Sequence, residues 1–337
     1  MKSKNGEKIK VLTWHIHGSY LYYLTQTPCD FYLPVKANKE EGYGGKSGTI
    51  PWGKNVHEIP AEEVKNHEFD CILFQSGKNY EKDQYEILSE KQRALPKIFL
   101  EHDPPREVPT DTRHIVDDPK MLLVHVTDFN NMMWNNNRTP TTVIQHGVII
   151  HSAVYTGEIP KGIVVINGIS KRGRRLGLDI FEKARKKIPL DLIGMGSEEL
   201  GGLGEIPNKE LPTFISKYRF FFNPIRYTSL GLSVCEAMMT GLPVVGMATT
   251  EMCVTIENDY SGYIHTNLDY LVEKMHTLIE NPEKAFQLSK GARETAIKKF
   301  NIKRFTDEWL EIFRMKTGKE NSLMREVGSE EENSIHK

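Results

Sequence analysis

Short, continuously apolar segments alternate with helix-sized amphipathic segments along most of this chain. In the second half we expect strands at residues 163–168, 190–194, 220–224 and 242–247, separated by helices at residues 177–187, 209–217 and 232–240. Strands that are apolar on both faces are typical of a parallel sheet that helices cover on both sides. The alternation therefore predicts an α/β protein.

The first half follows the same pattern less regularly, with expected strands at residues 10–18, 70–75, 97–102, 120–127 and 142–147. A chain of 337 residues is long enough for two domains that each bury a core. We assign residues 1–150 to the first domain and residues 151–300 to the second. We expect an amphipathic helix at residues 301–317 and a mobile polar tail at residues 318–337. Two doubly wound, Rossmann-like domains would hold a ligand in the central cleft between them.

Charge and cysteine content exclude some classes of partner. The 44 Lys and Arg residues nearly balance the 45 Asp and Glu residues, which argues against binding of nucleic acid through bulk charge. No apolar run approaches the roughly 18–20 residues of a membrane-spanning helix, and the charged N-terminus lacks the apolar stretch of a secretory signal. The four cysteines form no C-x-x-C pair. We therefore expect a cytoplasmic protein with no nucleic-acid partner.

The most informative stretch is residues 223–245, where a strand ends in a loop and a short helix follows, ending at Gly241. The backbone N–H groups of residues 230–233 lie at the N-terminus of that helix, which favours an anion such as a diphosphate. Glu236 comes one turn later, and a carboxylate can accept two hydrogen bonds from a ribose diol. From these residues alone, a nucleotide site and a plain strand–helix–strand core unit are equal alternatives.

The stretch resembles the signature of the group 1, family 4 glycosyltransferases, which have the GT-B fold of two Rossmann-like domains facing a central cleft. Their pattern is a Glu, seven residues, a second Glu, then Ala-Met, a glycine and Pro-Val-Val. Here Glu236 stands at the second Glu, followed by Ala237 and Met238, and Gly241 and residues 243–245 also match. The resemblance implies that Glu236 binds the nucleotide ribose and that the donor phosphates contact the loop residues Ser229, Leu230, Gly231 and Leu232.

Thr228 occupies the position of the first Glu, which in the family usually contacts the donor sugar. We therefore include Thr228 with Glu236 among the candidate catalytic residues and expect unusual donor selectivity. Thr228 either leaves more room around the sugar or has passed its role to Tyr227 or Arg226. The resemblance also implies that the helix at residues 301–317 packs back on the first domain.

A basic turn at residues 171–175 resembles the family loop that clamps the diphosphate. The strict spacing is not kept, because Leu176 stands where the family has a lysine before the glycine. Arg172 and Arg175 are the first candidates and Lys171 is the next, since guanidinium groups suit phosphate oxygens. A solvated basic turn is the alternative. Farther along, residues 204–207 match the place where the family's backbone meets the base, which implies a base contact at Ile206.

The first half contributes weaker candidates. His102 ends a predicted strand and resembles the family histidine that faces the donor sugar, so we count it as catalytic; a turn-capping histidine is the alternative. His17 and Gly18 follow the first strand, where the family has a loop lining the cleft, and His15 and His17 would project to one face of that strand.

Lys46, in a glycine-rich loop, is a candidate acceptor contact or else an ordinary surface residue. Residues 45–47 imitate a P-loop, but Glu40 replaces its first glycine.

The resemblance implies a retaining glycosyltransferase that moves a sugar from a UDP- or GDP-sugar to a hydroxyl of a glycan, a glycolipid or a similar acceptor. No D-x-D triplet occurs in the sequence, so we expect no metal requirement and no cofactor. The expected partners are the donor and a glycan or lipid-linked acceptor, and peripheral contact with the inner face of a membrane fits such an acceptor. The alternatives are a homologue that binds nucleotide-sugars without transferring them and a sugar-nucleotide epimerase.

Overall fold

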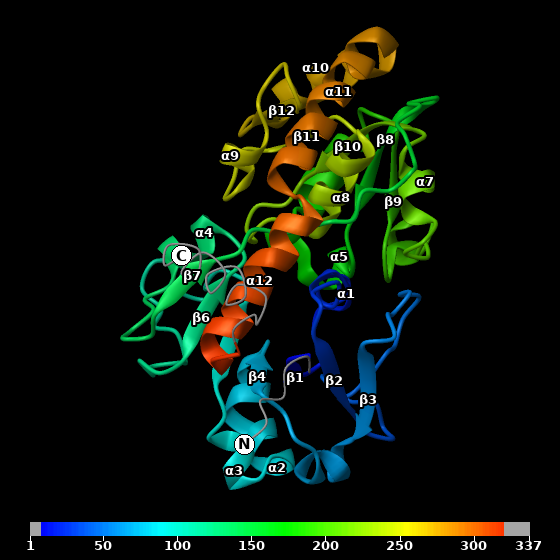
Figure 1. Ribbon diagram of the computed structural model, residues 1–337. Helices are drawn as coiled ribbons and strands as arrows, with labels where there is room; N and C mark the ends of the chain where they lie inside the picture. Colours follow the sequence, from blue (N-terminus) through cyan, green and yellow to red (C-terminus); the bar gives the residue numbers. More distant parts are fainter. Residues whose placement is uncertain (1–7, 320–337) are drawn as a thin grey trace, which may run out of the picture.

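The computed structural model describes residues 8–319 and contains two lobes, each built on a parallel sheet (Figure 1). The N-terminal sheet has seven strands in the order β3-β2-β1-β4-β5-β6-β7. Their bounds are β1 (Lys10–Thr13), β2 (Asp30–Val35), β3 (Val56–Pro60), β4 (Cys71–Phe74), β5 (Lys97–Glu101), β6 (Leu122–His125) and β7 (Thr141–Val143). The order places β1 near the centre, so the loops after β1, β4 and β5 open at the same edge of the sheet.

The C-terminal sheet has five parallel strands in the order β12-β11-β10-β8-β9. Their bounds are β8 (Ile159–Val165), β9 (Leu190–Ile193), β10 (Tyr218–Asn223), β11 (Val244–Met247) and β12 (Gly262–His265). All six residues of the central strand β10 are buried, as a strand covered on both faces requires. The predicted α/β class with two parallel sheets is confirmed, and the predicted boundary at residue 150 falls between β7 and β8.

The helices of the N-terminal lobe are short. They are α1 (Gly18–Leu24), α2 (Gln84–Ile87), α3 (Glu90–Arg93) and α4 (Asp128–Met133), together with the 3₁₀ turn η1 (Ala61–Asn66) and the π-helical turn η2 (Asn79–Asp83). Helix α1 begins directly after the loop that follows β1 and lies where the two lobes meet, next to the green α5 segment (Figure 1). Its residues Tyr20, Leu21, Tyr23 and Leu24 are buried. This helix therefore carries side chains of the N-terminal lobe to the junction.

The C-terminal lobe and its extension contain the remaining helices, of which the last three are the longest. They are α5 (Ile169–Arg172), α6 (Leu178–Ala184), α7 (Leu211–Ile215), α8 (Leu232–Thr240), α9 (Met252–Thr255), α10 (Leu268–Glu280), α11 (Pro282–Lys299) and α12 (Ile302–Thr317), with 3₁₀ turns η3 (Gly173–Leu176) and η4 (Ser197–Leu200). Helix α8 has the bounds that the sequence predicts, and Gly241 ends it with a left-handed φ of 94°. The predicted helix at residues 209–217 is shorter, since α7 begins at Leu211, next to Pro212, which suits a first turn.

Helix α12 leaves the C-terminal lobe and packs on the N-terminal lobe (Figure 1). Trp309 Nε1 donates to the hydroxyl of Tyr20 at 3.2 Å, and the rings of Phe313 and Phe31 meet with their centroids 6.1 Å apart.

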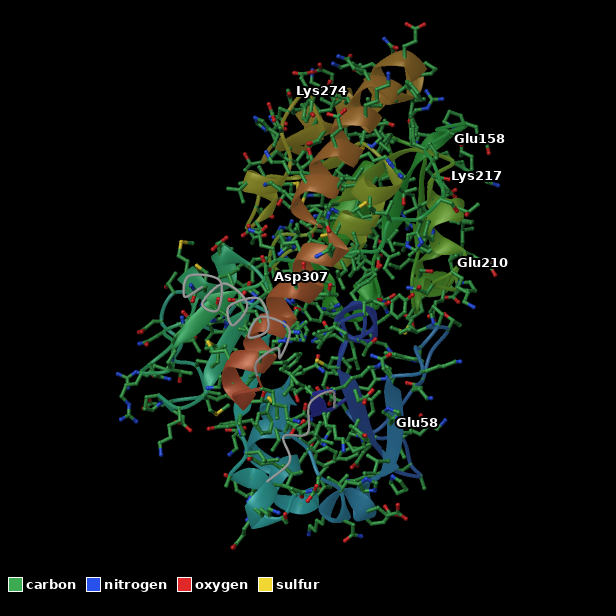
Figure 2. The ribbon with its side chains drawn as sticks, in the orientation of Figure 1. Glu58, Glu158, Glu210, Lys217, Lys274 and Asp307 are labelled. Atoms are coloured by element: carbon green, nitrogen blue, oxygen red, sulfur yellow. The ribbon has the colours of Figure 1, made fainter. Side chains whose placement is uncertain are left out.

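Charged side chains cover the outside of both lobes; Figure 2 labels Glu58, Glu158, Glu210, Lys217, Lys274 and Asp307. Within residues 8–319 no helix is both long and apolar enough to cross a membrane. Apart from residues 318–319, the predicted tail lies outside the described residues.

Candidate active site

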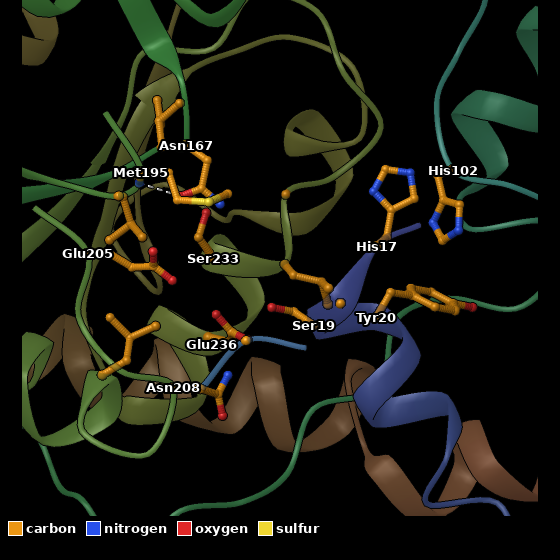
Figure 3. Close-up of a pocket in the computed structure, with 18 of the residues that line it drawn as sticks. His17, Ser19, Tyr20, His102, Asn167, Met195, Glu205, Asn208, Ser233 and Glu236 are labelled. Carbon is orange, nitrogen blue, oxygen red and sulfur yellow. Dashed lines mark hydrogen bonds between the residues drawn. The ribbon is translucent and has the colours of Figure 1, made fainter. Parts of the chain in front are cut away.

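A cavity of about 560 Å³ lies between the lobes, beside the carboxyl ends of both sheets. Figure 3 shows Ser233, Glu236, Glu205 and Asn208 on one side of it and His17 and His102 on the other. The structure brings together most of the predicted site residues in its lining: His17, Gly18, His102, Arg172, Ile206, Thr228, Ser229, Leu230, Gly231, Leu232 and Glu236. Three predicted residues, Lys46, Lys171 and Arg175, do not line it.

The N-terminus of α8 opens into this cavity. Its N-cap residue is Gly231, which has no side chain to accept a hydrogen bond from the first turn. Residues 230–233 all line the cavity. The first N–H groups of the helix are therefore oriented toward the space where an anionic ligand would lie, and the helix dipole favours negative charge there.

Glu236 reaches the cavity one turn into α8 and meets a residue of the other lobe. The Tyr23 hydroxyl on α1 donates to Glu236 Oε1 at 2.8 Å. Burial raises the pKa of Glu236 to about 7, while the hydrogen bond from Tyr23 acts in the opposite direction. Sequence analysis missed Tyr23, because it is separated from Glu236 by 213 positions and belongs to no motif.

Thr228 also lines the cavity, whereas the two residues before it, Arg226 and Tyr227, do not. Both terminal nitrogens of Arg226 donate to the Asp179 carboxylate, at 2.6 and 2.7 Å, and this pairing lowers the pKa of Asp179 to about 2. The Tyr227 hydroxyl donates to the carbonyl of Pro105 in the N-terminal lobe at 2.9 Å. The idea that Arg226 or Tyr227 takes over the role of the missing glutamate is therefore wrong, because both side chains are engaged outside the cavity lining.

The basic turn is split by Gly173, whose φ of 56° separates α5 from η3. Arg172 lines the cavity, while Lys171 is exposed on the outside of the turn. Arg174 pairs with Asp179 at 2.9 Å. Arg175 lies behind Arg172: its carbonyl accepts hydrogen bonds from the backbone of residues 226–227, and partial burial lowers the pKa of its guanidinium. Among the four cations of this turn, only Arg172 reaches the cavity in this arrangement.

His102 and His17 stack in the part of the cavity formed by the N-terminal lobe, with ring centroids 4.0 Å apart. His102 Nε2 lies 3.2 Å from Gln75 Oε1, and the amide nitrogen of Gln75 donates to Trp14 O and Thr13 Oγ1. Because Gln75 Oε1 can only accept, we assign the imidazole proton to Nε2. Burial holds the pKa of His102 well below its ordinary value, with His17 and His146 lowering it further. His102 is thus neutral at pH 7, and its Nδ1 is left as an acceptor.

The expectation that His15 and His17 share one face of a strand is wrong, because β1 ends at Thr13 and His17 is the N-cap residue of α1. Both line the cavity, but from different segments. His15 Nδ1 contacts the carbonyl of Gly45 at 2.5 Å, and its ring meets Trp52 edge to face. His15 therefore supports the segment between β2 and β3, while His17 faces His102.

That β2–β3 segment forms one wall of the cavity through residues 47–50. Lys46 itself points outward, and its backbone N–H donates to Glu58 Oε1 at 2.7 Å. The tight path requires Gly45, whose φ is 57° and where an added Cβ would lie 2.2 Å from the Glu58 carboxylate. At the tip, Thr49 Oγ1 accepts from the backbone N–H of Asn208 in the C-terminal lobe at 3.3 Å. The segment thus connects the two lobes beside the cavity.

His146 is a second residue that sequence analysis missed. It lies near the end of the expected strand at residues 142–147, so its place at a strand's carboxyl end was the available signal. Burial lowers its pKa to about 4, and its neutral Nε2 donates to the Leu230 carbonyl at 2.8 Å. His146 therefore anchors the loop before α8 from the other lobe. The cavity also contains Ser19, Asn167, Met195, Glu205 and Asn208, which carry no sequence motif.

Comparison with known proteins shows which proteins this chain resembles. Residues 196–295, which include α8 and Glu236, match the model of the family described as glycosyl transferases group 1. Trehalose synthase of Pyrococcus horikoshii is 26% identical over 163 residues, 46% of this chain and 37% of that enzyme. A poly(ribitol-phosphate) alpha-N-acetylglucosaminyltransferase of Staphylococcus aureus is 28% identical over 117 residues, 34% of this chain and 23% of that enzyme. The chain thus matches well under half the length of either relative.

Solved structures resemble the whole chain. Sucrose-phosphate synthase of Thermosynechococcus elongatus superposes with a TM-score of 0.68 at 13% identity, covering 92% of this chain and 99% of that one. The Anabaena protein HepE, in complex with UDP-glucose, superposes with a TM-score of 0.69 at 13% identity, covering 92% of this chain and 100% of that one. Two facing Rossmann-like lobes with a cleft between them define the GT-B class. The chain has this fold, and its residues 196–295 match the group 1 glycosyltransferases.

Proposed function

We propose that this chain transfers a sugar from a UDP- or GDP-sugar to a hydroxyl of a glycan, a glycolipid or a similar acceptor, with retention of anomeric configuration. The observation that carries the proposal is the convergence of Glu236, the uncapped N-terminus of α8 and Arg172 on one interlobe cavity. These three features match the ribose diol and the diphosphate of a nucleotide donor. HepE, which has the same fold, is described in complex with UDP-glucose.

The geometry suggests an orientation for the donor. With the ribose at Glu236, the diphosphate would lie along residues 230–233 and meet Arg172, and the base would reach toward Ile206. The sugar would then extend toward Thr228 and His102. His102 Nδ1 can accept a hydrogen bond from a sugar hydroxyl, since Nε2 is engaged with Gln75. The acceptor would approach from the side of His17 and residues 47–50.

In this orientation the chain's own groups stabilise the leaving diphosphate. As the glycosidic bond breaks, negative charge accumulates on the phosphate oxygens, where helix N–H groups and Arg172 are already oriented. The leaving phosphate would take the acceptor proton, so a separate catalytic base is not required.

Residues 8–319 contain no cluster of three or more His, Cys, Asp or Glu side chains suited to a metal ion. We propose that turnover needs neither a metal nor a cofactor, because cations and helix amides neutralise the leaving group.

Product analysis tests this proposal. The full chain is incubated with UDP- and GDP-sugars and with glycan or lipid-linked acceptors, in EDTA and again with magnesium or manganese, and the products are identified by mass spectrometry and NMR. We expect an acceptor carrying one α-linked sugar from an α-linked donor, formed equally in EDTA. Activity that requires the metal would contradict the mechanism.

Thr228 favours a second candidate, a homologue that binds nucleotide-sugars without transferring them, because the donor-sugar side of the cavity lacks the family's carboxylate. The same incubations separate the alternatives. Tight binding of the donor with no product on any acceptor would support a binding protein. Recovery of the donor with an inverted sugar centre would support an epimerase.

A further inference from the structure

We propose that Tyr23 is a positioning residue that holds the Glu236 carboxylate for the nucleotide ribose, so that the nucleotide site of the C-terminal lobe is completed by the N-terminal lobe. The inference rests on the proposed nucleotide site and adds a residue that belongs to none of its motifs. Tyr23 lies on α1, near the start of the chain, whereas Glu236 lies on α8. Their hydrogen bond is 2.8 Å long.

The Tyr23 hydroxyl is held in place by its surroundings. Its ring is only 2% exposed and packs beside the ring of Tyr22, with centroids 5.5 Å apart. A tyrosine ring has few rotatable bonds, so a buried ring on an anchored helix fixes its hydroxyl without a large further loss of conformational entropy. Helix α1 is anchored by Tyr20, whose hydroxyl accepts from Trp309 of α12. The donor that meets Glu236 is therefore preorganised.

The hydrogen bond orients the carboxylate and still leaves room for the ribose. A carboxylate has two oxygens with about four lone-pair sites. Tyr23 takes one site on Oε1, and no other side chain among the described residues donates to the Glu236 carboxylate; Thr240 donates to its backbone carbonyl. Oε2 and the second site of Oε1 remain for the two hydroxyls of a ribose diol. Tyr23 thus fixes the direction of Glu236 without occupying the sites that the nucleotide needs.

Tyr23 also favours the form of Glu236 that can accept both ribose hydroxyls. Burial favours the neutral carboxylic acid, whose O–H would stand where a ribose hydroxyl needs an acceptor. The hydrogen bond that Tyr23 donates favours the ionised carboxylate instead. Other titratable groups here are Cys235, next to Glu236 on α8, and Tyr22, next to Tyr23 on α1; burial raises the pKa of each. Glu205 lines the same cavity, and Arg293 of α11 donates to the Met239 carbonyl at the far end of α8.

The test compares Tyr23→Phe, which removes only the hydroxyl, with the control Tyr22→Phe, which removes a neighbouring hydroxyl that does not bond to Glu236. Calorimetry measures the affinity of each full-length variant for UDP and GDP and for their 2′,3′-dideoxy counterparts. We expect Tyr23→Phe to weaken binding of the preferred ribonucleotide by about tenfold, or roughly 1.4 kcal/mol, and to leave the dideoxy nucleotide unchanged. The control should match the parent for both ligands.

Two further readouts separate positioning from a general structural role. Tyr23→Phe should raise KM for the donor while kcat stays within about twofold, because a loss of uniform binding acts on KM. The pH at which nucleotide affinity reaches half its maximum should move upward, since the carboxyl loses a hydrogen bond to its charged form. A variant Tyr23→3-fluorotyrosine keeps the ring and donates more strongly, so it should move that pH downward even if Tyr23→Phe does not fold.

Unchanged or tighter ribonucleotide binding in Tyr23→Phe would overturn the inference, as would equal losses for ribo- and dideoxynucleotides or an unmoved pH midpoint in the fluorinated variant. In each of these outcomes the parent still binds its nucleotide, so the proposed function stands. A parent chain that binds neither UDP nor GDP would remove the proposed function and this inference together.

Discussion

Replacing Arg172 by alanine tests the assignment of the diphosphate to the N-terminus of α8. Arg172 is the one residue of the 171–175 turn whose side chain lines the cavity, and partial burial lowers the pKa of its guanidinium. A hydrogen bond to a charged group contributes about 1.5–3 kcal/mol. Arg172 is accessible to solvent, which screens the interaction, so we take the lower end of that range. The expected loss of UDP or GDP affinity is then roughly tenfold.

Calorimetry with a nucleoside diphosphate, its monophosphate and the nucleoside shows where the loss arises. Arg172→Ala should weaken diphosphate binding by that factor and leave nucleoside binding nearly unchanged. Arg174→Ala is the matched control, because Arg174 belongs to the same turn but pairs with Asp179 outside the cavity. Equal losses for all three ligands, or an equal loss in the control, would refute the placement of the phosphates beside Arg172.

Four further predictions rest on the same structure. Nucleotide affinity should rise as the pH rises through about 7, because burial raises the pKa of Glu236 from 4.5 to about 7 and the ribose needs the ionised form; calorimetry across that range checks it. The same shift should make the free energy of unfolding fall as the pH rises from 4.5 to 7, since the folded state binds the proton more tightly. Thr228→Glu should change the ranking of donor sugars in a product assay while UDP or GDP affinity stays within about twofold; an identical ranking would show that position 228 does not face the sugar. Gly177→Ala should destabilise the fold by several kcal/mol in denaturant titrations, because the added Cβ would lie 2.0 Å from the Pro224 carbonyl oxygen at a φ of 79°. Gly201→Ala, at a φ of 73° in the left-handed helical region and with nothing within 4 Å, should cost only about 1–2 kcal/mol.

The strand–helix ladder of the second half is readable from sequence because its strands are buried on both faces. Strand β10 is entirely buried, and its short, continuous apolar run is typical of a strand covered on both faces. Strands β2, β3 and β12 are missing from the prediction for the opposite reason. Strand β3 lies at the edge of its sheet and mixes buried and solvated residues, while β12 ends in the partly exposed Ile264 and the exposed His265. Strand β2 begins at the partly buried Asp30 and mixes buried and partly exposed residues. None of the three has the continuous apolar pattern of a central strand.

Part of the candidate site is predictable from the sequence, and part of it is not. Glu236 and the start of α8 follow from local spacing, since a helix turn fixes their relation. Tyr23 could not be predicted, because it reaches the site from the other lobe through tertiary packing. His146 also comes from the other lobe, and its place near the end of a predicted strand was its only sequence signal. The role of the basic turn at residues 171–175 is predictable only in part. Its composition predicts a cation near the phosphates, but the left-handed Gly173 decides which of them enters the cavity.

The most direct test of the central claim is a crystal structure of the full chain with UDP or GDP bound at saturating concentration. We expect the nucleotide in the interlobe cavity, with both ribose hydroxyls on Glu236 and Tyr23 still bonded to the same carboxylate. The diphosphate should lie on the N–H groups of residues 230–233 and on Arg172. A nucleotide bound elsewhere, or bound in this cavity with its ribose away from Glu236, would contradict the account.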